Sequence, residues 1–324
     1  MSRRRAVVVL MCLVLTMALV FSACGGGSQK TETKPSTPAP AQNAPEAKKD
    51  SSDKKVVKFK FVGNNQSALV TEACKKVAKD LEEKSGGTLK PELYLEGQLG
   101  SKDEDLCMGL GEGNYEMLIN GEWFPIWHSP EWMGWYNTVF AFRDSDHLSK
   151  FWQGEIGQEL DKKSIEKYNV TTYYKTLILR GARQLTANKP VKNVDDMKGM
   201  KMRTPNIPGV IASWKATGAN VTPIPWGELY GALQTGIANA QENPFANIDQ
   251  IAMYQVQKYL MMTSHQRNCF FVHMNNKWFK GLSADQQKII TEAFDKHFGW
   301  HNQMVKEDDE KLAKKFVEKG MTII

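Results

Sequence analysis

The stretch from Leu179 to Pro244, LRGARQLTANKPVKNVDDMKGMKMRTPNIPGVIASWKATGANVTPIPWGELYGALQTGIANAQENP, decides the fold class that the sequence predicts. Short apolar runs alternate in it with helical patterns that begin at Pro or Glu and end at Gly. The predicted order is strand, helix, strand, helix, strand, at residues 201–203, 208–214, 221–224, 228–233 and 237–241. This order is typical of a parallel sheet flanked by helices, so we expect an α/β protein.

A segment nearer the N-terminus repeats this order of elements. Alternating aromatic and lysine residues indicate a first half-buried strand, and apolar residues four apart indicate the helix after it. Pro91 places the second strand at an edge of the sheet. The elements are a strand at 57–61, a helix from 67 to 85, a strand at 89–95, a helix up to 108 and a strand at 115–120. The repeat predicts two similar lobes.

The remaining elements are expected to join the two lobes. A long strand at 170–179 and a return strand at 269–272 would cross between them. Helices are predicted at 145–160, 246–262, 283–294 and 306–318, with a short strand at 321–324. We assign lobe 1 to about 55–179 and 269–305, and lobe 2 to about 180–268 with the C-terminal helix at 306–324.

The N-terminal 54 residues are typical of export and tethering. Three arginines, Arg3 to Arg5, precede an apolar run at 6–21 that ends in Ser22-Ala23-Cys24, and this junction resembles a lipoprotein signal that acylates the cysteine. A plain secretory signal and a membrane-anchoring helix are the alternatives. Residues 25–54 contain no large apolar side chain and predict a disordered tether. The expected units are therefore a signal peptide at 1–23, a lipid-anchored tether at 24–54 and a folded domain at 55–324.

Charge and cysteine content argue against several classes of protein. The formal net charge is +6, but eight basic and four acidic residues precede residue 55, so the folded part is nearly neutral and predicts no nucleic-acid partner. The five cysteines form no CxxC pair, and no histidine lies at metal-ligand spacing from them. We expect no metal and no cofactor. Cys74 lies on an apolar helical face, which predicts a buried thiol, although a disulfide between Cys74 and Cys107 is an alternative.

Candidate binding residues follow strand ends in both predicted lobes. Ligands in open α/β sheets bind at the carboxyl ends of the strands, where Arg203, Arg183 and Asn243 would meet and suit a carboxylate. An aromatic side chain beside them would form a wall of the pocket. The first lobe offers further candidates in its loops. Together the wall and the loop candidates are Trp226, Asn64, Glu122 and Trp123.

A structural role is the alternative for each second-lobe candidate. Arg203 could form a salt bridge within its lobe, and Arg183 could stabilise its lobe through an ion pair. Asn243 precedes a proline and could serve in a turn or helix cap. Trp226 could be a core residue, as could Trp123 in the first lobe.

Residues 56–324 resemble the solute receptors of tripartite ATP-independent periplasmic (TRAP) transporters, the DctP-like family. The resemblance rests on a set of motifs in the family's order rather than on any single one. These are Gln98-Leu99-Gly100, Arg183-Gln184-Leu185-Thr186, Asp196 to Arg203, Gly218-Ala219, Glu228 to Gln234, Gln241-Glu242-Asn243-Pro244 and Val256 to Tyr259. Asn239-Ala240, Thr138-Val139-Phe140 and the tryptophan-rich segment 123–135 depart from the family pattern and leave the identity of the ligand open.

This resemblance implies a two-lobed, periplasmic-binding-protein-like α/β fold, each lobe a mixed sheet flanked by helices, with the ligand cleft between the lobes. It implies that Arg203 pairs with a ligand carboxylate, Arg183 assists it, Asn243 donates a hydrogen bond and Trp226 packs on the ligand. Asn64 and the loop at Glu122 match first-lobe contacts less firmly.

The implied function is an exported, membrane-anchored receptor that delivers an organic acid to small and large permease subunits for ion-driven uptake. The chain would then not be an enzyme. A ligand-sensing lipoprotein and an exported lipid-anchored enzyme are the alternatives, but the sequence contains no GxSxG motif and no catalytic spacing among its six histidines.

Overall fold

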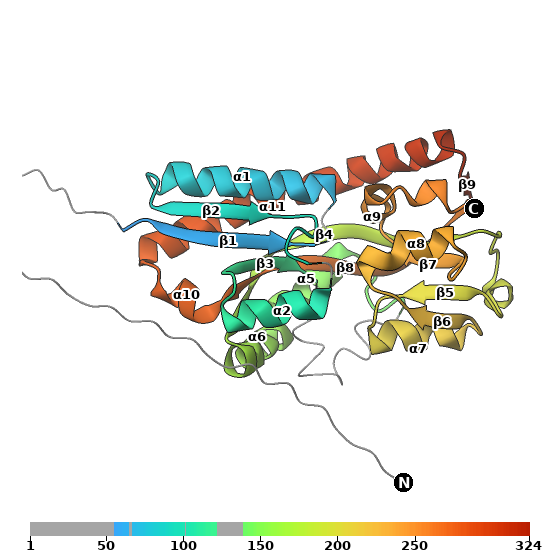
Figure 1. Cartoon of the computed structure of the whole chain (residues 1–324), viewed down its shortest axis with the longest axis horizontal. Coiled ribbons are helices and arrows are strands. Elements are labelled where there is room, and N and C mark those ends of the chain that lie inside the picture. The colour runs from blue at the N-terminus through green and yellow to red at the C-terminus, as the bar shows by residue number, and fades with distance from the viewer. Residues whose placement is uncertain (1–54, 65–66, 101, 122–138) are drawn as a thin grey trace, which may run out of the picture. The chain divides into compact units, whose positions relative to one another are not determined.

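A computed structural model describes residues 55–64, 67–100, 102–121 and 139–324. In this part of the chain, nine strands form a single mixed sheet with the order β2-β1-β3-β8-β4-β7-β5-β6, and β9 is paired with β8. Helices cover both faces of the sheet (Figure 1). The α/β class and the two-lobed arrangement predicted from the sequence are confirmed. Cys24, Glu122 and Trp123 lie outside the described residues.

The first lobe is built on β1 (Val57–Gly63), β2 (Leu89–Tyr94) and β3 (Met117–Asn120). The three strands are parallel and β2 lies at the edge, as Pro91 indicated. Two helices connect them, α1 (Ala68–Lys84) and α2 (Asp103–Glu112). The Ser67 hydroxyl caps α1 by accepting a hydrogen bond from the backbone N–H of Val70.

The second lobe repeats this topology with β5 (Lys201–Thr204), β6 (Asn220–Pro223) and β7 (Ala240–Asn243). These strands are also parallel, with β5 in the middle. The connections are α7 (Pro208–Ala216), which begins at a proline in its first turn, and the short pair η2 (Trp226–Glu228) and α8 (Leu229–Gln234). A short 3-10 turn, η1 (Val194–Met197), precedes β5.

Two long antiparallel strands, β4 (Val170–Ala187) and β8 (Tyr259–Asn275), join the lobes. Both are longer than the sequence predicted, and the helix predicted at 246–262 is wrong over its second half. Only α9 (Phe245–Gln250) and the turn η3 (Met253–Gln255) are helical there. Tyr259 and Leu260 instead pair with β4 on one side and with β9 (Thr322–Ile323) on the other, so pairing within the sheet overrides the local helical pattern.

A single 35-residue helix, α11 (Ala284–Glu318), replaces the two C-terminal helices that the sequence predicted. A capping box of Ser283 and Gln286 begins it, and no proline interrupts it. Gly299 costs a helix only about 1 kcal/mol, which packing can offset. The helix packs against α1, β4 and α9, so it contacts elements of both lobes. Figure 1 shows it, in red, running alongside α1.

The remaining helices cover lobe 1. They are α5 (Ser145–Gln153), α6 (Glu155–Tyr168) and α10 (Asn276–Gly281). One core cluster holds residues of α2, α5 and α6, whereas a second holds residues of α1 and α11. No helix among the described residues is long and apolar enough to span a membrane.

The cysteines of the folded domain are separate buried thiols. Cys74 of α1 belongs to one core cluster and Cys107 of α2 to the other, and both are free, as is Cys269. Burial raises the pKa of the Cys74 and Cys107 thiols well above the usual range. The buried-thiol interpretation is confirmed and the disulfide alternative is wrong, because the two side chains occupy different clusters.

Candidate functional site

A cleft lies where strand ends of lobe 1 face strand ends of lobe 2. Its volume is about 470 Å³, within the range of small-molecule sites. Lobe 1 contributes the start of α2, and lobe 2 contributes the ends of β5 and β6 with the turns that follow them. The lining residues are Lys102, Asp103, Glu104, Arg203, Pro205, Asn206, Pro223, Ile224, Pro225 and Trp226.

Arg203 is the buried cation of this cleft. Its position in β5, just before Thr204-Pro205, leaves 3% of the residue exposed. The Nε and Nη2 groups donate hydrogen bonds to the carbonyl oxygen of Ile224 at 2.9 and 2.6 Å. These bonds hold the side chain against the residue that follows β6. Among the described residues, no carboxylate lies within ion-pair distance of its guanidinium.

The electrostatic environment of Arg203 disfavours its charge. Burial lowers its pKa most, the carboxylate of Glu242 raises it, Arg183 lowers it and Asp103 raises it, and the net pKa is about 10. The side chain is still a cation at neutral pH. A buried cation held by one carbonyl oxygen and facing a cleft is suited to an anion, which would restore the lost solvation.

Trp226 forms a wall on the same side of the cleft. It opens η2 directly after Pro225, is half-buried and packs against the core cluster that contains Ile224 and Leu229. Its ring therefore has both of the roles weighed from the sequence, since it contacts the core and lines the cleft.

The polar group on the lobe 1 wall is Asp103, which was not among the candidates predicted from the sequence. Its Oδ1 atom accepts hydrogen bonds from the amide Nδ2 atoms of Asn64 and Asn120, each at 2.9 Å. The pKa of Asp103 is raised, because the effect of burial outweighs the hydrogen bonds from the two amides, which lower it. Asn64 directly follows β1 and Asn120 ends β3, so neighbouring parallel strands bring both amides to the first residue of α2. Asp103 follows the Gln98-Leu99-Gly100 turn, and this position was the available signal.

Arg183 occupies a different environment, inside a network of buried charges. Its Nε donates to Oε2 of Glu242, and its Nη2 lies 2.8 Å from both Oε1 and the carbonyl oxygen of the same residue. Glu242 is fully buried. The ring Nε2 of His265 lies 3.2 Å from Oε2 of Glu242, and Nδ1 lies 2.7 Å from the Thr263 hydroxyl. This geometry matches the ion-pair alternative for Arg183.

The carboxyl group of Glu242 is charged within this network. Burial alone would raise its pKa, but the Arg183 guanidinium and the hydrogen bond from His265 outweigh that effect and hold the pKa at about 2. The network links β4, β7 and β8, because Arg183, Glu242 and His265 come from those three strands. It therefore connects three strands of the sheet through charged side chains.

Asn243 extends the same network. Its Oδ1 accepts from Nη2 of Arg183 at 3.0 Å, and its Nδ2 donates to Oε1 of Gln241 at 2.6 Å. Gln241 in turn donates to the Thr186 hydroxyl on β4. The structure thus brings Arg203 and Trp226 to the cleft lining, bonds Asn64 to Asp103 of that lining, and places Arg183 and Asn243 in the buried network with Glu242.

Glu122 and Trp123 come directly after Gly121 in the sequence, and Gly121 is a described residue. His273 of β8 is buried, with Nε2 at 2.9 Å from the carbonyl oxygen of Gly121 and Nδ1 at 2.8 Å from the Thr172 hydroxyl. Burial lowers the pKa of His273 to about 4, so the ring is neutral and donates from one nitrogen only. No group of three or more metal-ligating side chains occurs among the described residues.

Comparison with known proteins gives one consistent result. The family model of the bacterial extracellular solute-binding proteins, family 7, termed DctP, matches residues 62–324. A solute-binding protein of Roseobacter denitrificans is 31% identical over 237 residues, 73% of this chain and 71% of that protein. The sialic acid-binding periplasmic protein of Vibrio cholerae is 31% identical over 259 residues, 78% of this chain and 77% of that protein. These names describe binding proteins and not enzymes.

Solved structures agree with this match. The Roseobacter denitrificans TRAP periplasmic protein with bound L-galactonate has a TM-score of 0.75 and 29% identity, covering 83% of this chain and 89% of that one. A TRAP periplasmic protein of Ochrobacterium anthropi with bound L-fuconate has a TM-score of 0.76 and 27% identity, covering 83% and 88%. One of Pseudomonas putida with bound D-glucuronate has a TM-score of 0.75 and 25% identity, covering 83% and 87%.

Proposed function

Because this chain belongs to the DctP family, family 7 of the bacterial extracellular solute-binding proteins, we propose that it captures an organic acid through a carboxylate clamp at Arg203. The observation that carries the proposal is the buried Arg203 guanidinium, which lines the cleft and has no carboxylate within ion-pair distance among the described side chains. A planar guanidinium accepts a carboxylate in a bidentate pair. Arg183 and Asn243 would assist from beneath by holding the end of β7 in place.

The opposite wall narrows the proposed ligand to a monocarboxylic acid that carries hydroxyl groups. Asp103 faces the cleft from lobe 1 with two asparagine amides on one of its oxygens. A hydroxyl group can donate to such a carboxylate, whereas a second ligand carboxylate would be repelled by it. The galactonate, fuconate and glucuronate bound by the structural neighbours are acids of this kind. Trp226 would then pack on the carbon chain of the ligand.

A thermal-shift screen tests this function. A ligand that binds only the folded protein at 100 times its Kd stabilises it by about 2.7 kcal/mol, or about 5 °C for a domain of this size. We expect aldonic and uronic acids to raise the melting temperature, and succinate and malate to do so less. The Arg203→Ala variant should show no shift. A melting temperature unmoved by every acid in the panel would overturn the carboxylate-receptor assignment.

Delivery to a membrane permease forms part of the same proposal. We expect the loaded receptor to pass its acid to the small and large permease subunits that TRAP receptors serve. Uptake of the acid by vesicles that contain the permease should require added receptor. Arg203→Ala receptor should not support it, and uptake without any receptor would contradict the role.

Membrane attachment through Cys24 completes the proposed arrangement. The basic residues, apolar run and Ser22-Ala23-Cys24 junction support lipidation at this cysteine. Mass spectrometry of native protein should find a diacylglyceryl group on an N-terminal Cys24. An unmodified N-terminus inside residues 25–54 would rule out the anchor.

A further inference from the structure

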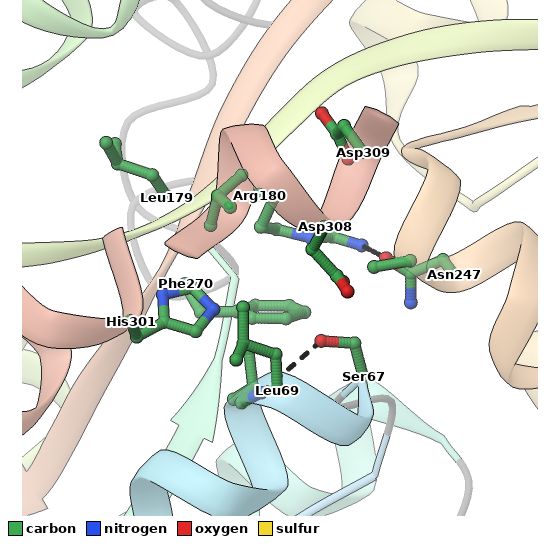
Figure 2. Close-up of a pocket in the computed structure, with 12 residues that line it drawn as sticks. Ser67, Leu69, Leu179, Arg180, Asn247, Phe270, His301, Asp308 and Asp309 are labelled. Atoms are coloured by element: carbon green, nitrogen blue, oxygen red, sulfur yellow. Dashed lines mark hydrogen bonds between the residues drawn. The ribbon is translucent and has the colours of Figure 1, made fainter. Parts of the chain in front are cut away.

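A second, much smaller cavity lies away from the cleft, between α11 and the crossing strands (Figure 2). Its volume is about 20 Å³, room for a single water molecule. Both lobes line it, since Ser67 is the N-cap of α1, Val70 lies in α1 and Asn247 lies in α9. The crossing strands add Leu179, Arg180 and Phe270, and α11 adds His301, Val305, Asp308 and Asp309. Any movement of one lobe against the other must change this cavity.

The strand β4 is irregular beside the cavity. Its pairing with β8 shifts register between Leu179 and Ala182, and Gly181 at that shift has φ +72°, which L side chains rarely adopt. A Cβ atom at Gly181 would lie 2.6 Å from Oδ2 of Asp309. The backbone of the crossing strand and the Asp309 carboxyl group are thus in close contact where the two lobes join.

Two neighbouring carboxyl groups, Asp308 and Asp309, face this junction from α11. Figure 2 shows the Asp308 carboxylate pointing toward Ser67 of α1. Among the described side chains, neither carboxylate takes part in an ion pair. Burial raises the pKa of Asp309 to about 7, with Asp308 adding to the effect, and burial also raises the pKa of Asp308.

The charged groups around the pair come from three elements. β4 offers Arg180, whose Nη2 donates to Oδ1 of Asn247 at 2.7 Å and whose guanidinium lies 4.0 Å from the Phe270 ring centre. α9 offers Asp249, which raises the pKa of Asp308 and is itself paired with Lys315 at 2.6 Å. α11 contributes Lys311 and Lys315, which lower the pKa of Asp308, and His301, whose own pKa burial lowers to about 4. The cavity-lining residues of α1 and β8 carry no titratable group.

We propose that Asp309, with Asp308 beside it, is a proton-sensitive element of the hinge that sets the balance between two positions of the lobes. The described arrangement holds the Asp309 carboxyl group against Gly181 and leaves both carboxyl groups half-buried, so it favours the protonated form. A wider arrangement would admit water to the cavity and favour the charged form. Lowering the pH therefore stabilises the described arrangement, and raising the pH releases it.

X-ray scattering of the full chain without ligand, from pH 5.5 to pH 8.5, tests this inference. The radius of gyration should change across this range with a midpoint near pH 7. Asp309→Asn, which resembles the protonated carboxyl group, should keep the low-pH radius throughout. Asp308→Asn should shift the midpoint to lower pH, because it removes the neighbouring charge. Glu310→Gln removes an exposed charge one residue further along α11 and should behave like the wild type.

The outcomes separate cleanly. A wild-type radius that is constant over the whole range, or an Asp309→Asn variant that follows the wild-type curve, would overturn the proposal. Circular dichroism at both pH limits checks that each variant is folded. The measurement uses no ligand, so its failure would leave the carboxylate clamp untouched, and a failed ligand screen would leave the hinge untouched.

Discussion

Two buried arginines of the same lobe differ in what the fold supplies to balance their charge. Arg183 of β4 is 5% exposed and Arg203 of β5 is 3% exposed, so burial does not distinguish them. Their partners do. Arg183 is held by both carboxylate oxygens of Glu242, whereas Arg203 contacts the carbonyl oxygen of Ile224 and faces a cleft. A buried charge whose partner comes from the fold is structural, and one that faces solvent space without a fold-supplied counter-ion is suited to a ligand.

We therefore expect that loss of the Arg183–Glu242 pair lowers the stability of the fold and that loss of the Arg203 charge weakens ligand binding. Removing one partner of a buried pair costs about 3–5 kcal/mol, since the other charge is left uncompensated. Arg203 leaves no such partner behind, because the fold supplies it only with a carbonyl oxygen. The two sites should therefore respond in opposite ways to equivalent substitutions.

The largest effect is expected for Glu242→Ala. We predict that the free energy of unfolding falls by about 3–5 kcal/mol, because Arg183 stays buried without a counter-ion. Urea unfolding followed by circular dichroism measures it. Glu83→Ala is the control, since Glu83 belongs to an exposed pair with Lys79 at 3.7 Å and such pairs contribute less than about 1 kcal/mol. Equal losses in the two variants would remove the distinction between the arginines.

The next largest effect concerns binding. Arg203→Ala should weaken binding of the acid found in the thermal screen by two to three orders of magnitude, about 3–4 kcal/mol, with the fold intact. Arg203→Lys should recover only part of this, because an ammonium lacks the planar fork.

Calorimetry on folded protein decides this prediction. Lys201→Ala is the matched control, since Lys201 lies two residues earlier on β5, is exposed and bonds the carbonyl oxygen of Gly236. Its affinity should equal that of the wild type. Near-wild-type affinity for Arg203→Ala would remove the clamp.

Much of the fold could be predicted because it depends on local patterns. The two runs of alternating strands and helices, with Pro91 at an edge and Pro208 at a helix start, determine the two sets of parallel strands within the single sheet. The crossing strands could not be bounded this way. The local pattern at Tyr259 to Met262 predicts a helix. These residues form a strand because β4 and β9 lie on either side of them.

The sequence position of single residues predicted part of the cleft lining, but contacts between distant residues could not be predicted. Arg203 lies near the end of β5 and Trp226 follows β6, and both line the cleft. Arg183 looks the same in sequence, and its partner is revealed only by the register of β4 on β7, which sets Leu185 opposite Glu242. The role of Asp103 could not be predicted from the sequence, because its two amide donors, Asn64 and Asn120, are 56 residues apart in the chain.

A smaller effect is expected when pH is varied. The titration should isolate the contribution of the Arg183–Glu242 ion pair to the free energy of unfolding. Glu242 has a pKa of about 2 in the folded protein against 4.5 ordinarily. A lowered carboxyl pKa stabilises the fold above the unfolded value, and this contribution is lost as the pH falls from about 4.5 toward 2. Glu242→Gln has no such titration. The stability difference between wild type and this variant should therefore shrink over that window, and a constant difference in urea unfolding would contradict it.

The smallest effect is expected for Asp103→Asn. Asp103 lines the lobe 1 wall of the cleft, which faces Arg203. The substitution keeps the shape of the side chain and removes one negative charge from the cleft. A hydroxyl donor on the ligand then meets a neutral amide oxygen, and a hydrogen bond to a charged group is worth about 1.5–3 kcal/mol against about 1 kcal/mol for a neutral pair. Affinity for a hydroxylated monocarboxylate should fall about tenfold.

A dicarboxylate should bind more tightly to the variant than to the wild type, since the repulsion of its second carboxylate is relieved. Asp105→Asn, an exposed carboxylate in the same first turn of α2, should change neither affinity. Calorimetry with one acid of each class measures the ratio of the two affinities. If Asp103→Asn leaves that ratio unchanged, Asp103 does not select the ligand, and the cleft distinguishes acids through Arg203 and Trp226 alone.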